Sequence, residues 1–243
     1  MRRVTSDANR VVLCDLDDTL FDHAGATRDA LAQVRLRSPE LGRWTLDEFD
    51  QRHRVVLEAL HTEVLAGQWT IEDARIERFR RLMRDAGVED ADCTPDVLHS
   101  LSWGYRGAYE GAWRLVPGAI ALVRAIKASG AHLVIVTNNV LREQQLKIDR
   151  GGLAPFVDAL VTSEEFGATK PDPRIIIHAL ERVNAAPEHA VMFGDSLTTD
   201  IEGGRRAGVR VVWFNRFGAV SHDRTLAEVS SLEDPRTLEL LRG

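Results

Sequence analysis

Four carboxylates in this sequence stand where their side chains could do chemistry together. Asp15 and Asp17 directly follow one short apolar segment, and Asp195 and Asp200 follow another. If the two segments are neighbouring strands of one sheet, these carboxylates converge. Two unit charges about 4 Å apart repel by roughly 4 kcal/mol at an effective dielectric constant near 20, so such a cluster requires a cation. Because the donors are all oxygens, the pattern favours Mg²⁺.

Two further segments end in polar residues that suit a phosphate group. Thr137 and Asn138 follow the apolar segment His132–Val136. A hydroxyl and main-chain N–H groups at the start of a helix form an anion site there. Lys170 stands in a proline-containing loop and is one of only three lysines in the chain. Its ammonium group would supply a point charge to a phosphate or to Asp15.

Together these side chains fit phosphoryl transfer through a carboxylate nucleophile. Asp15 would attack phosphorus and form an aspartyl phosphate. Asp17 would protonate the leaving oxygen and then deprotonate the attacking water. Mg²⁺, Lys170 and Thr137 would stabilise charge on the transferred group.

Several of these residues also have a purely structural interpretation. A shared site explains Asp15, Asp17 and Asp195 together far better than helix capping does. Considered one at a time, Asp18, Thr19, Asp195 or Ser196 could instead cap a helix. Thr137 and Asn138 could be turn residues. Lys170 could be a solvated residue in a loop.

Apolar segments and helical periodicity alternate after residue 117, which is typical of βαβ units. The sequence therefore predicts an α/β fold with a doubly wound parallel sheet. The expected strands are Val11–Cys14, His132–Val136, Val157–Val161, Ala190–Phe193 and Val209–Phe214. The expected helices are Ala119–Ala128, Val140–Arg150, Pro173–Asn184 and Thr198–Ala207, with a short strand and a terminal helix between Leu226 and Leu241.

The long segment from Ala24 to about Trp113 has helical periodicity throughout, which predicts an all-helical insertion directly after the first strand. Open α/β sheets bind ligands at the carboxyl ends of their strands, so this insertion would lie over the site like a lid. Its aromatic residues and one histidine are candidates for substrate contact or for packing inside the helical bundle. They are Trp44, His53, Trp69, Trp103, Tyr105, Tyr109 and Trp113.

Composition argues against several classes of protein. The formal net charge of −6 for 243 residues is unsuited to binding a nucleic acid polymer. No apolar run reaches the roughly 20 residues that span a bilayer, and the first ten residues lack the apolar core of a secretory signal. Cys14 and Cys93 do not make a disulfide framework. We therefore expect a cytoplasmic protein without a membrane partner.

Four segments resemble, in this order, the motifs of the haloacid dehalogenase-like (HAD) hydrolase superfamily. The resemblance implies a Rossmann-like core domain over residues 1–22 and 115–243, with a type-one helical cap domain over residues 23–114. The matching segments are Asp15-Leu-Asp-Asp-Thr-Leu20, Thr137-Asn138, Lys170-Pro-Asp172, and Gly194-Asp-Ser196 with Asp200.

The resemblance also implies a role for each matched residue. The catalytic residues are Asp15, Asp17, Thr137 and Lys170; the phosphate-binding residues are Thr137, Asn138 and Lys170; the Mg²⁺ ligands are Asp15, Asp17 (through its main-chain carbonyl) and Asp195; and Asp200 lies beside the metal.

Asp17 separates functions within this superfamily. Members that cleave carbon–halogen bonds or phosphonates differ at this position, so Asp17 favours phosphate ester hydrolysis. The segment Gly194–Gly204 is similar to a branch that contains pyrimidine 5′-nucleotidases and acylneuraminate 9-phosphatases. We therefore expect a Mg²⁺-dependent phosphatase of a nucleoside monophosphate or sugar phosphate, acting as a monomer or homodimer. The alternatives are a phosphomutase or phosphotransferase on the same scaffold, and a non-catalytic binding module that retains the fold.

Overall fold

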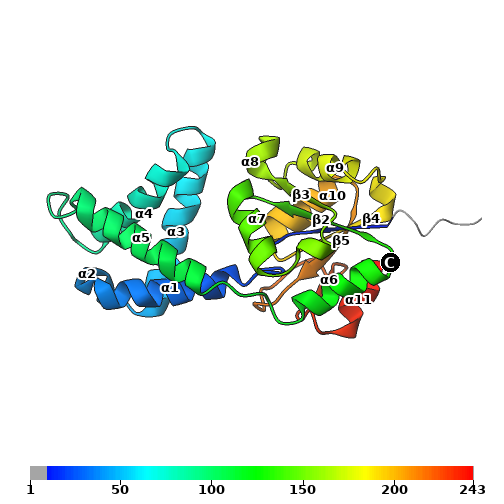
Figure 1. Cartoon of the computed structure of the whole chain (residues 1–243), viewed down its shortest axis with the longest axis horizontal. Helices are drawn as coiled ribbons and strands as arrows, with labels where there is room; N and C mark the ends of the chain where they lie inside the picture. The colour runs from blue at the N-terminus through cyan, green and yellow to red at the C-terminus, as the bar shows by residue number, and fades with distance from the viewer. Residues whose placement is uncertain (1–9, 243) are drawn as a thin grey trace, which may run out of the picture. The chain divides into compact units, whose positions relative to one another are not determined.

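The chain forms two compact units in the computed structural model, which describes residues 10–242. The core unit consists of the chain up to Asp22 and from Arg114 onward, and the helical unit is His23–Trp113 (Figure 1). The predicted lack of a secretory signal concerns the first ten residues, of which 1–9 lie outside the described residues.

The core unit is built on one six-stranded sheet in which all neighbouring strands are parallel. The strand order is β3-β2-β1-β4-β5-β6, so the first strand lies in the middle, as in doubly wound folds. This confirms the predicted α/β fold with a helical insertion after the first strand. The strands are β1 Val11–Cys14, β2 His132–Thr137, β3 Ala159–Thr162, β4 Ala190–Gly194, β5 Arg210–Phe214 and β6 Ala227–Val229.

The strand register places the carboxyl ends of β1, β2 and β4 at one edge of the sheet. Cys14, the last residue of β1, pairs with one residue of β2 and one of β4. Asp15, Thr137 and Asp195 therefore emerge at the same edge from three adjacent strands. Parallel sheets bind ligands at this edge, and the fold alone thus brings the predicted residues together.

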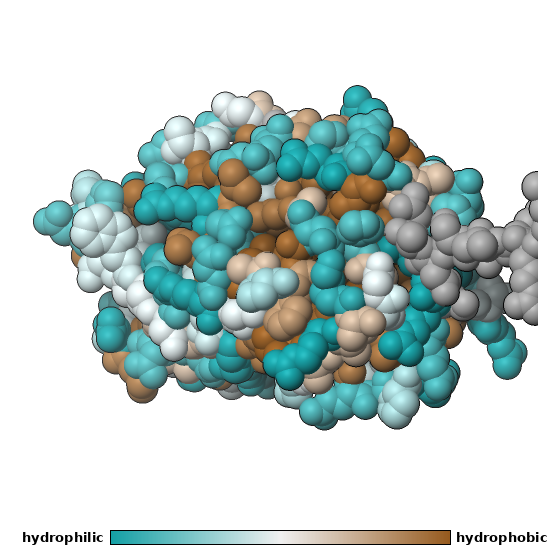
Figure 2. Space-filling view, turned by 45° about the vertical axis from the view of Figure 1, so that its right-hand side comes forward, coloured by the Kyte–Doolittle hydropathy of each residue, from teal (hydrophilic) through white to brown (hydrophobic). Residues whose placement is uncertain are grey.

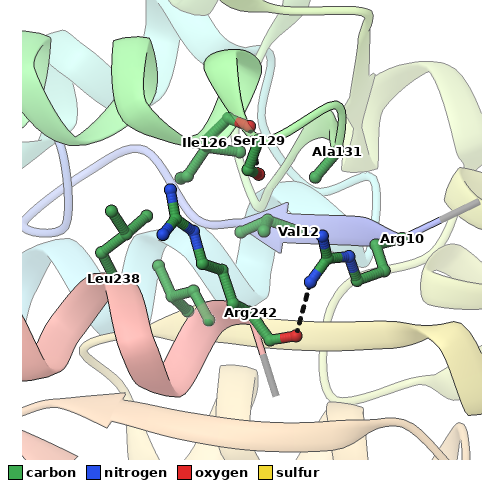
Figure 3. A pocket seen from close by; sticks show the side chains of 8 residues that line it. Arg10, Val12, Ile126, Ser129, Ala131, Leu238 and Arg242 are labelled. Carbon is green, nitrogen blue, oxygen red and sulfur yellow. Dashed lines mark hydrogen bonds between the residues drawn. The ribbon is translucent and has the colours of Figure 1, made fainter. Parts of the chain in front are cut away.

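Helices cover both faces of the sheet, which explains why the central strands are apolar without interruption. Val11 and Leu13 lie in one buried cluster with Ile175 and Ile176 of α9. Val12, in contrast, lines a small cavity with Ile126 of α6 and Leu238 of α11 (Figure 3). The helices of this unit are α6 Ala119–Ala128, α7 Leu141–Arg150, α8 Ser163–Phe166, α9 Pro173–Glu181, α10 Glu202–Arg206 and α11 Pro235–Arg242, with short 3₁₀ turns at Ala154–Phe156 (η2) and Pro187–His189 (η3).

The predicted helix Thr198–Ala207 is interrupted in the structure. A π-helical turn, η4, spans Leu197–Ile201 and is followed by the short helix α10. Gly204 in α10 lies so close to the sheet that an added Cβ would approach Val211 Cγ1 to 2.7 Å. π-Helical turns are frequent at functional sites, and this one carries the buried side chain of Asp200.

The helical unit consists of α1 to α5. A threonine stands directly before each of the helices α3, α4 and α5. The hydroxyls of Thr45, Thr70 and Thr94 each accept a main-chain N–H hydrogen bond at a helix start. Apolar residues of the predicted periodic faces, Phe49 and Phe79 among them, are buried between the helices. The helices are α1 His23–Arg37, α2 Pro39–Gly42, α3 Leu46–Leu65, α4 Ile71–Asp85 and α5 Pro95–Gly111.

A small cavity lies at the start of β1, at the opposite end of the strand from Asp15 (Figure 3). Its volume is about 10 Å³, which is room for at most one water molecule. The Arg10 guanidinium donates a hydrogen bond of 3.2 Å to the main-chain carbonyl of Arg242 beside it. The cavity thus lies between the first strand and the last helix, and it is too small to hold a substrate.

The surface mixes hydrophilic and hydrophobic residues, as Figure 2 shows for one face. Isolated apolar side chains at a surface are common in folded proteins. Among residues 10–242, no helix combines the length and the hydrophobicity needed to cross a bilayer. Among the side chains that the structure describes, the large apolar ones that are exposed are Leu36, Val55, Val97, Trp103, Phe217 and Val220.

Candidate active site

Asp15 lies buried at the end of β1, in the middle of the sheet edge. Its main-chain N–H donates a 2.9 Å hydrogen bond to the carbonyl of Phe193 on β4, which fixes the backbone beside the neighbouring strand. Its Oδ1 accepts a 2.6 Å hydrogen bond from Lys170 Nζ. Its Oδ2 accepts a longer one, 3.4 Å, from the hydroxyl of Thr19. One carboxylate oxygen is thus held firmly while the other is held weakly.

Lys170 places its buried ammonium group among three acceptors. Besides Asp15 Oδ1, Nζ lies 2.6 Å from the main-chain carbonyl of Val136 and 2.7 Å from Asp200 Oδ1. Burial disfavours the charge of this ammonium, but the attraction of Asp15 and Asp200 outweighs burial and raises the pKa of Lys170. The side chain therefore stays a cation next to Asp15, as the predicted role in holding a phosphoryl group requires.

Asn138 fixes the main chain of Lys170 across the gap between two loops. Its Nδ2 donates to the carbonyl of Lys170 at 2.9 Å, and its Oδ1 accepts from the N–H of Lys170 at 2.7 Å. The predicted phosphate contact of Asn138 would therefore fall to its main-chain N–H, because both polar atoms of the side chain are engaged.

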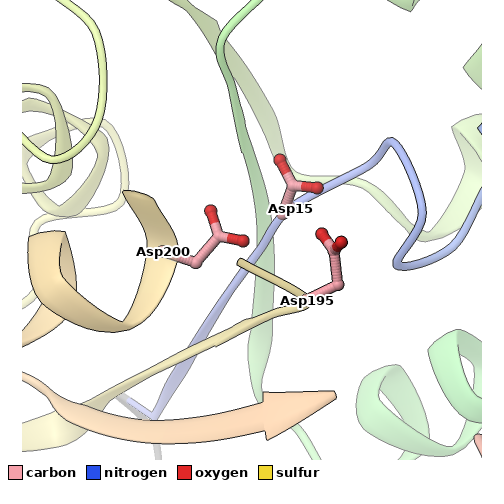
Figure 4. Close-up of side chains that lie close together, drawn as sticks. All are labelled: Asp15, Asp195 and Asp200. Carbon is pink, nitrogen blue, oxygen red and sulfur yellow. The ribbon is translucent and has the colours of Figure 1, made fainter. Parts of the chain in front are cut away.

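Three carboxylates converge at the edge of the sheet, as Figure 4 shows. Asp15, Asp195 and Asp200 each offer an oxygen within 4.8 Å of the other two. Asp200 reaches this position because residue 194 is glycine: an added Cβ there would lie 2.3 Å from Asp200 Oδ2. The Ser196 N–H donates to the same oxygen at 3.0 Å. Three of the four carboxylates that were predicted to converge therefore meet in the fold, and Asp17 is not part of this group.

The electrostatics of this cluster fit a divalent cation. Burial, reinforced by the charges of Asp15 and Asp200, raises the pKa of Asp195 to about 8. Burial likewise raises the pKa of Asp15 to about 7, against the opposing attraction of Lys170. Without a cation, it is therefore unfavourable for Asp15 and Asp195 to be ionised at the same time. Because the donors are all carboxylate oxygens, Mg²⁺ suits the cluster better than a metal that prefers nitrogen or sulfur.

Asp17 is held from one side by residues on and just before α7. Its Oδ1 accepts from Lys147 Nζ at 2.6 Å. Its Oδ2 accepts from Gln144 Nε2 at 2.8 Å and from Asn139 Nδ2 at 3.2 Å. Gln144 Nε2 also donates to the hydroxyl of Thr137 at 2.8 Å. Gln144 therefore links the predicted acid/base to the predicted phosphate-binding threonine.

Sequence reasoning missed these contacts of α7 and one contact of β5. The indole N–H of the buried Trp213 donates a 2.7 Å hydrogen bond to the main-chain carbonyl of Asp195. One signal pointed to Lys147: it is one of three lysines in a chain whose other cations are arginines. No local pattern pointed to Gln144 or Trp213, since their partners lie in other strands and loops.

The capping alternatives are resolved by the local geometry. Ser196, not Asp195, caps η4, and its hydroxyl accepts from the N–H of Thr199 at 3.2 Å. Asp18 and Thr19 lie in a tight turn before α1, which begins only at His23. Asp18 has a φ of 63° in that turn, a conformation that aspartate tolerates better than most residues. The carboxylates of Asp15 and Asp195 thus face the site rather than a helix end.

Several candidate substrate contacts of the insertion are packed inside the helical unit. His53 is 1% exposed and its ring lies 5.3 Å from the ring of Tyr105. Burial, with the neighbouring charge of Arg78, lowers the pKa of His53 well below its usual value. Trp103, in contrast, is 74% exposed. The positions of His53 and Tyr105 are therefore explained by packing inside the helical unit.

A family model described as haloacid dehalogenase-like hydrolase matches residues 9–208. The matched range begins before β1 and ends after α10, so it includes all the segments that gave the resemblance in the sequence.

Curated relatives agree with this match. The chain is 30% identical to HAD-hydrolase YfnB of Bacillus subtilis (strain 168) over 207 residues, which are 85% of this chain and 84% of that protein. It is 28% identical to N-acylneuraminate-9-phosphatase of Rattus norvegicus over 217 residues, 87% of this chain and 84% of that protein. It is 40% identical to pyrimidine 5'-nucleotidase YjjG of Escherichia coli (strain K12) over 101 residues, 41% of this chain and 44% of that protein.

The similarity extends to a solved structure. A crystal structure of YfnB from Bacillus subtilis bound to magnesium matches with a TM-score of 0.74 and 28% identity. The match covers 96% of this chain and 98% of that one. Both branches that the sequence pattern indicated, nucleotidase and acylneuraminate phosphatase, are represented among the relatives.

Proposed function

Because the chain belongs to the haloacid dehalogenase-like hydrolase family, we propose that it is a Mg²⁺-dependent phosphatase of small phosphorylated metabolites. The observation that carries this proposal is the surroundings of Asp15. One oxygen is fixed by Lys170, and the acidic group of Asp195 and Asp200 lies within 4.8 Å. Asp17 follows on the same loop as a separate proton donor and acceptor.

In the first half of the reaction, Asp15 attacks the phosphorus atom through the oxygen that Lys170 does not hold. The bond between phosphorus and the ester oxygen breaks as the bond to Asp15 forms. Asp17 gives its proton to the ester oxygen, and the alcohol leaves. The hydroxyl of Thr137 donates a hydrogen bond to a phosphoryl oxygen, and the positive charge of Lys170 offsets the negative charge of the transferred group.

In the second half, Asp17 takes a proton from a water molecule. The water oxygen attacks phosphorus, the bond between phosphorus and Asp15 breaks, and inorganic phosphate is released. Both aspartates then have their starting protonation, because Asp17 has regained the proton that it gave to the alcohol.

The residues that would hold the metal are Asp15 and Asp195, with the main-chain carbonyl of Asp17 as a third donor and Asp200 beside them. A bound Mg²⁺ supplies positive charge for the transferred group. The carboxylates of Asp15 and Asp195 supply the oxygen donors that this ion prefers. A bound cation would favour the ionised form of Asp195 in particular, because burial and the neighbouring carboxylates disfavour its charge.

We propose that the helical unit acts as a cap that selects the substrate. Named relatives act on a pyrimidine nucleotide and on an acylneuraminate 9-phosphate, which supports a nucleoside monophosphate or a sugar phosphate as the substrate of this chain. Cys14 and Cys93 are both buried free thiols, which supports a reducing compartment such as the cytoplasm.

A screen of phosphorylated metabolites tests the proposal. The full chain with Mg²⁺ is incubated with pyrimidine nucleotides, sugar phosphates and phosphoglycolate, and released phosphate is measured. We expect hydrolysis of at least one class, and none by the Asp15→Asn variant prepared in the same way. Release by neither protein would contradict the proposal, and phosphorus NMR that showed transfer to a second hydroxyl would replace it with a phosphotransferase.

A further inference from the structure

Helix α7 directs two fully buried polar side chains at Asp17. Lys147 and Gln144 lie three residues apart and therefore on one face of the helix. The Lys147 side chain has 0% exposure, and Gln144 is equally buried. Lys147 Nζ lies 2.6 Å from Asp17 Oδ1, and Gln144 Nε2 lies 2.8 Å from Asp17 Oδ2. Each oxygen of this carboxylate thus has its own donor from α7.

Burying these two groups is costly for folding. A buried ammonium loses its hydration, although Lys147 also lies 3.3 Å from Glu143 and over the ring of Phe21 at 4.7 Å. Gln144 Oε1 is buried and has no hydrogen-bond partner among the described residues, which costs about 1–3 kcal/mol. Leucine or methionine at these positions would fill a similar volume without the free-energy cost of burying polar groups. The cost therefore indicates a role beyond packing.

Gln144 also constrains the hydroxyl of Thr137. Its Nε2 has two hydrogens, and it donates one to Asp17 Oδ2 and the other to Thr137 Oγ1 at 2.8 Å. Because the Thr137 oxygen accepts this bond, its own proton must point elsewhere. That proton is then available for a phosphoryl oxygen. A single amide group thus sets the direction of the threonine and the position of the aspartate.

We propose that Gln144 and Lys147 are positioning residues that hold Asp17 for proton transfer to the leaving group. This inference rests on the proposed phosphatase function. Each donor fixes one oxygen of Asp17, so the two together set the direction in which its carboxyl group faces the leaving oxygen. The pair therefore acts most strongly on substrates whose leaving oxygen requires a proton.

The dependence of the rate on the leaving group tests this role. A metabolite ester releases an alkoxide-like oxygen that must be protonated, whereas acetyl phosphate and dinitrophenyl phosphate release stable anions. We compare the wild-type chain with Lys147→Met and Gln144→Met, which keep the buried volume. The quantity measured is kcat/KM, because it reports the steps up to transfer of the phosphoryl group to Asp15 and omits the later hydrolysis.

We expect both variants to lose about 10- to 100-fold in kcat/KM on the metabolite ester and far less on the two activated substrates. The control is Gln145→Ala on the same helix, whose exposed side chain donates a hydrogen bond to Asp149. This variant should match the wild type. Equal losses on all substrates, or no loss, would overturn the inference. If the wild type hydrolyses no substrate at all, the proposed function fails and this inference with it.

Discussion

Asn138 holds Lys170 by both main-chain polar groups. The amide nitrogen of Asn138 donates to the carbonyl of Lys170 at 2.9 Å, and its oxygen accepts from the N–H of Lys170 at 2.7 Å. Asn138 lies in the loop between β2 and α7, and Lys170 lies in the loop between α8 and α9. This pair fixes the backbone from which the Lys170 ammonium extends toward Asp15. The side chain of Asn138 thus acts on the site through Lys170.

Substitution of Asn138 should therefore lower catalysis more than substrate binding. We expect Asn138→Ala to reduce kcat by about 10- to 100-fold, the usual effect of removing a group that orients a directly acting residue. The KM for the best substrate should change less, since the ammonium still attracts the phosphate. Steady-state kinetics on the substrate found in the metabolite screen measures both. An unchanged kcat would show that the loop holds Lys170 without this clamp.

The metal-free protein should become less stable as the pH rises through neutrality. Burial raises the pKa of Asp15 to about 7 and that of Asp195 to about 8. At pH values between the ordinary aspartate pKa and these raised values, the folded chain binds more protons than the unfolded chain. The free energy of unfolding therefore decreases as the pH rises. The stabilising contribution of the two neutral carboxyls is complete at low pH and is lost above about pH 8.

Mg²⁺ should reverse this loss, because it favours the ionised carboxylates. Thermal unfolding is measured with and without Mg²⁺ at about pH 6 and about pH 9, on either side of the two raised pKa values. We expect a larger increase in Tm from Mg²⁺ at the higher pH. Asp195→Asn is the matched control, which should show a smaller increase and little dependence on pH. An equal effect of Mg²⁺ on both proteins would speak against Asp195 as a ligand.

Trp213 should affect the metal site through a single hydrogen bond. Its indole N–H donates to the carbonyl of Asp195 at 2.7 Å, and Trp213→Phe removes that bond while keeping most of the packing. We expect a loss of stability of about 1 kcal/mol and weaker binding of Mg²⁺. Trp69→Phe is the control, because it removes a similar 2.8 Å bond to Glu63 in the helical unit. Isothermal titration with Mg²⁺ should distinguish the two; the same affinity in both variants would refute the role of Trp213.

The sequence predicted most of the sheet because parallel strands covered on both faces are apolar throughout. The segments Val11–Cys14 and Ala190–Phe193 illustrate this. Asp15 directly follows the first, Gly194 and Asp195 follow the second, and the strand order places the two segments side by side. Helix ends were predicted less well. The pattern predicted one helix over Thr198–Ala207. In the structure this segment is a π-helical turn, which carries Asp200, followed by the short helix α10, in which Gly204 packs closely on the sheet.

Contacts between distant segments could not be predicted from local patterns. Lys147 meets Asp17 across 130 residues of sequence, and nothing in the helical periodicity of α7 indicates which buried position faces that carboxylate. Asp200 shows the same limit. The sequence predicted that its carboxylate meets Asp15, but only the fold reveals that it also pairs with Lys170 at 2.7 Å.

The proposed covalent step at Asp15 is tested most directly by trapping the intermediate. The full chain is mixed with Mg²⁺ and its best substrate, quenched in acid within one turnover, and digested for mass spectrometry. This mechanism predicts a phosphoryl group on the peptide that contains Asp15, and no such peptide and no turnover with Asp15→Asn. A phosphoryl group on another residue, or continued hydrolysis by Asp15→Asn, would contradict it.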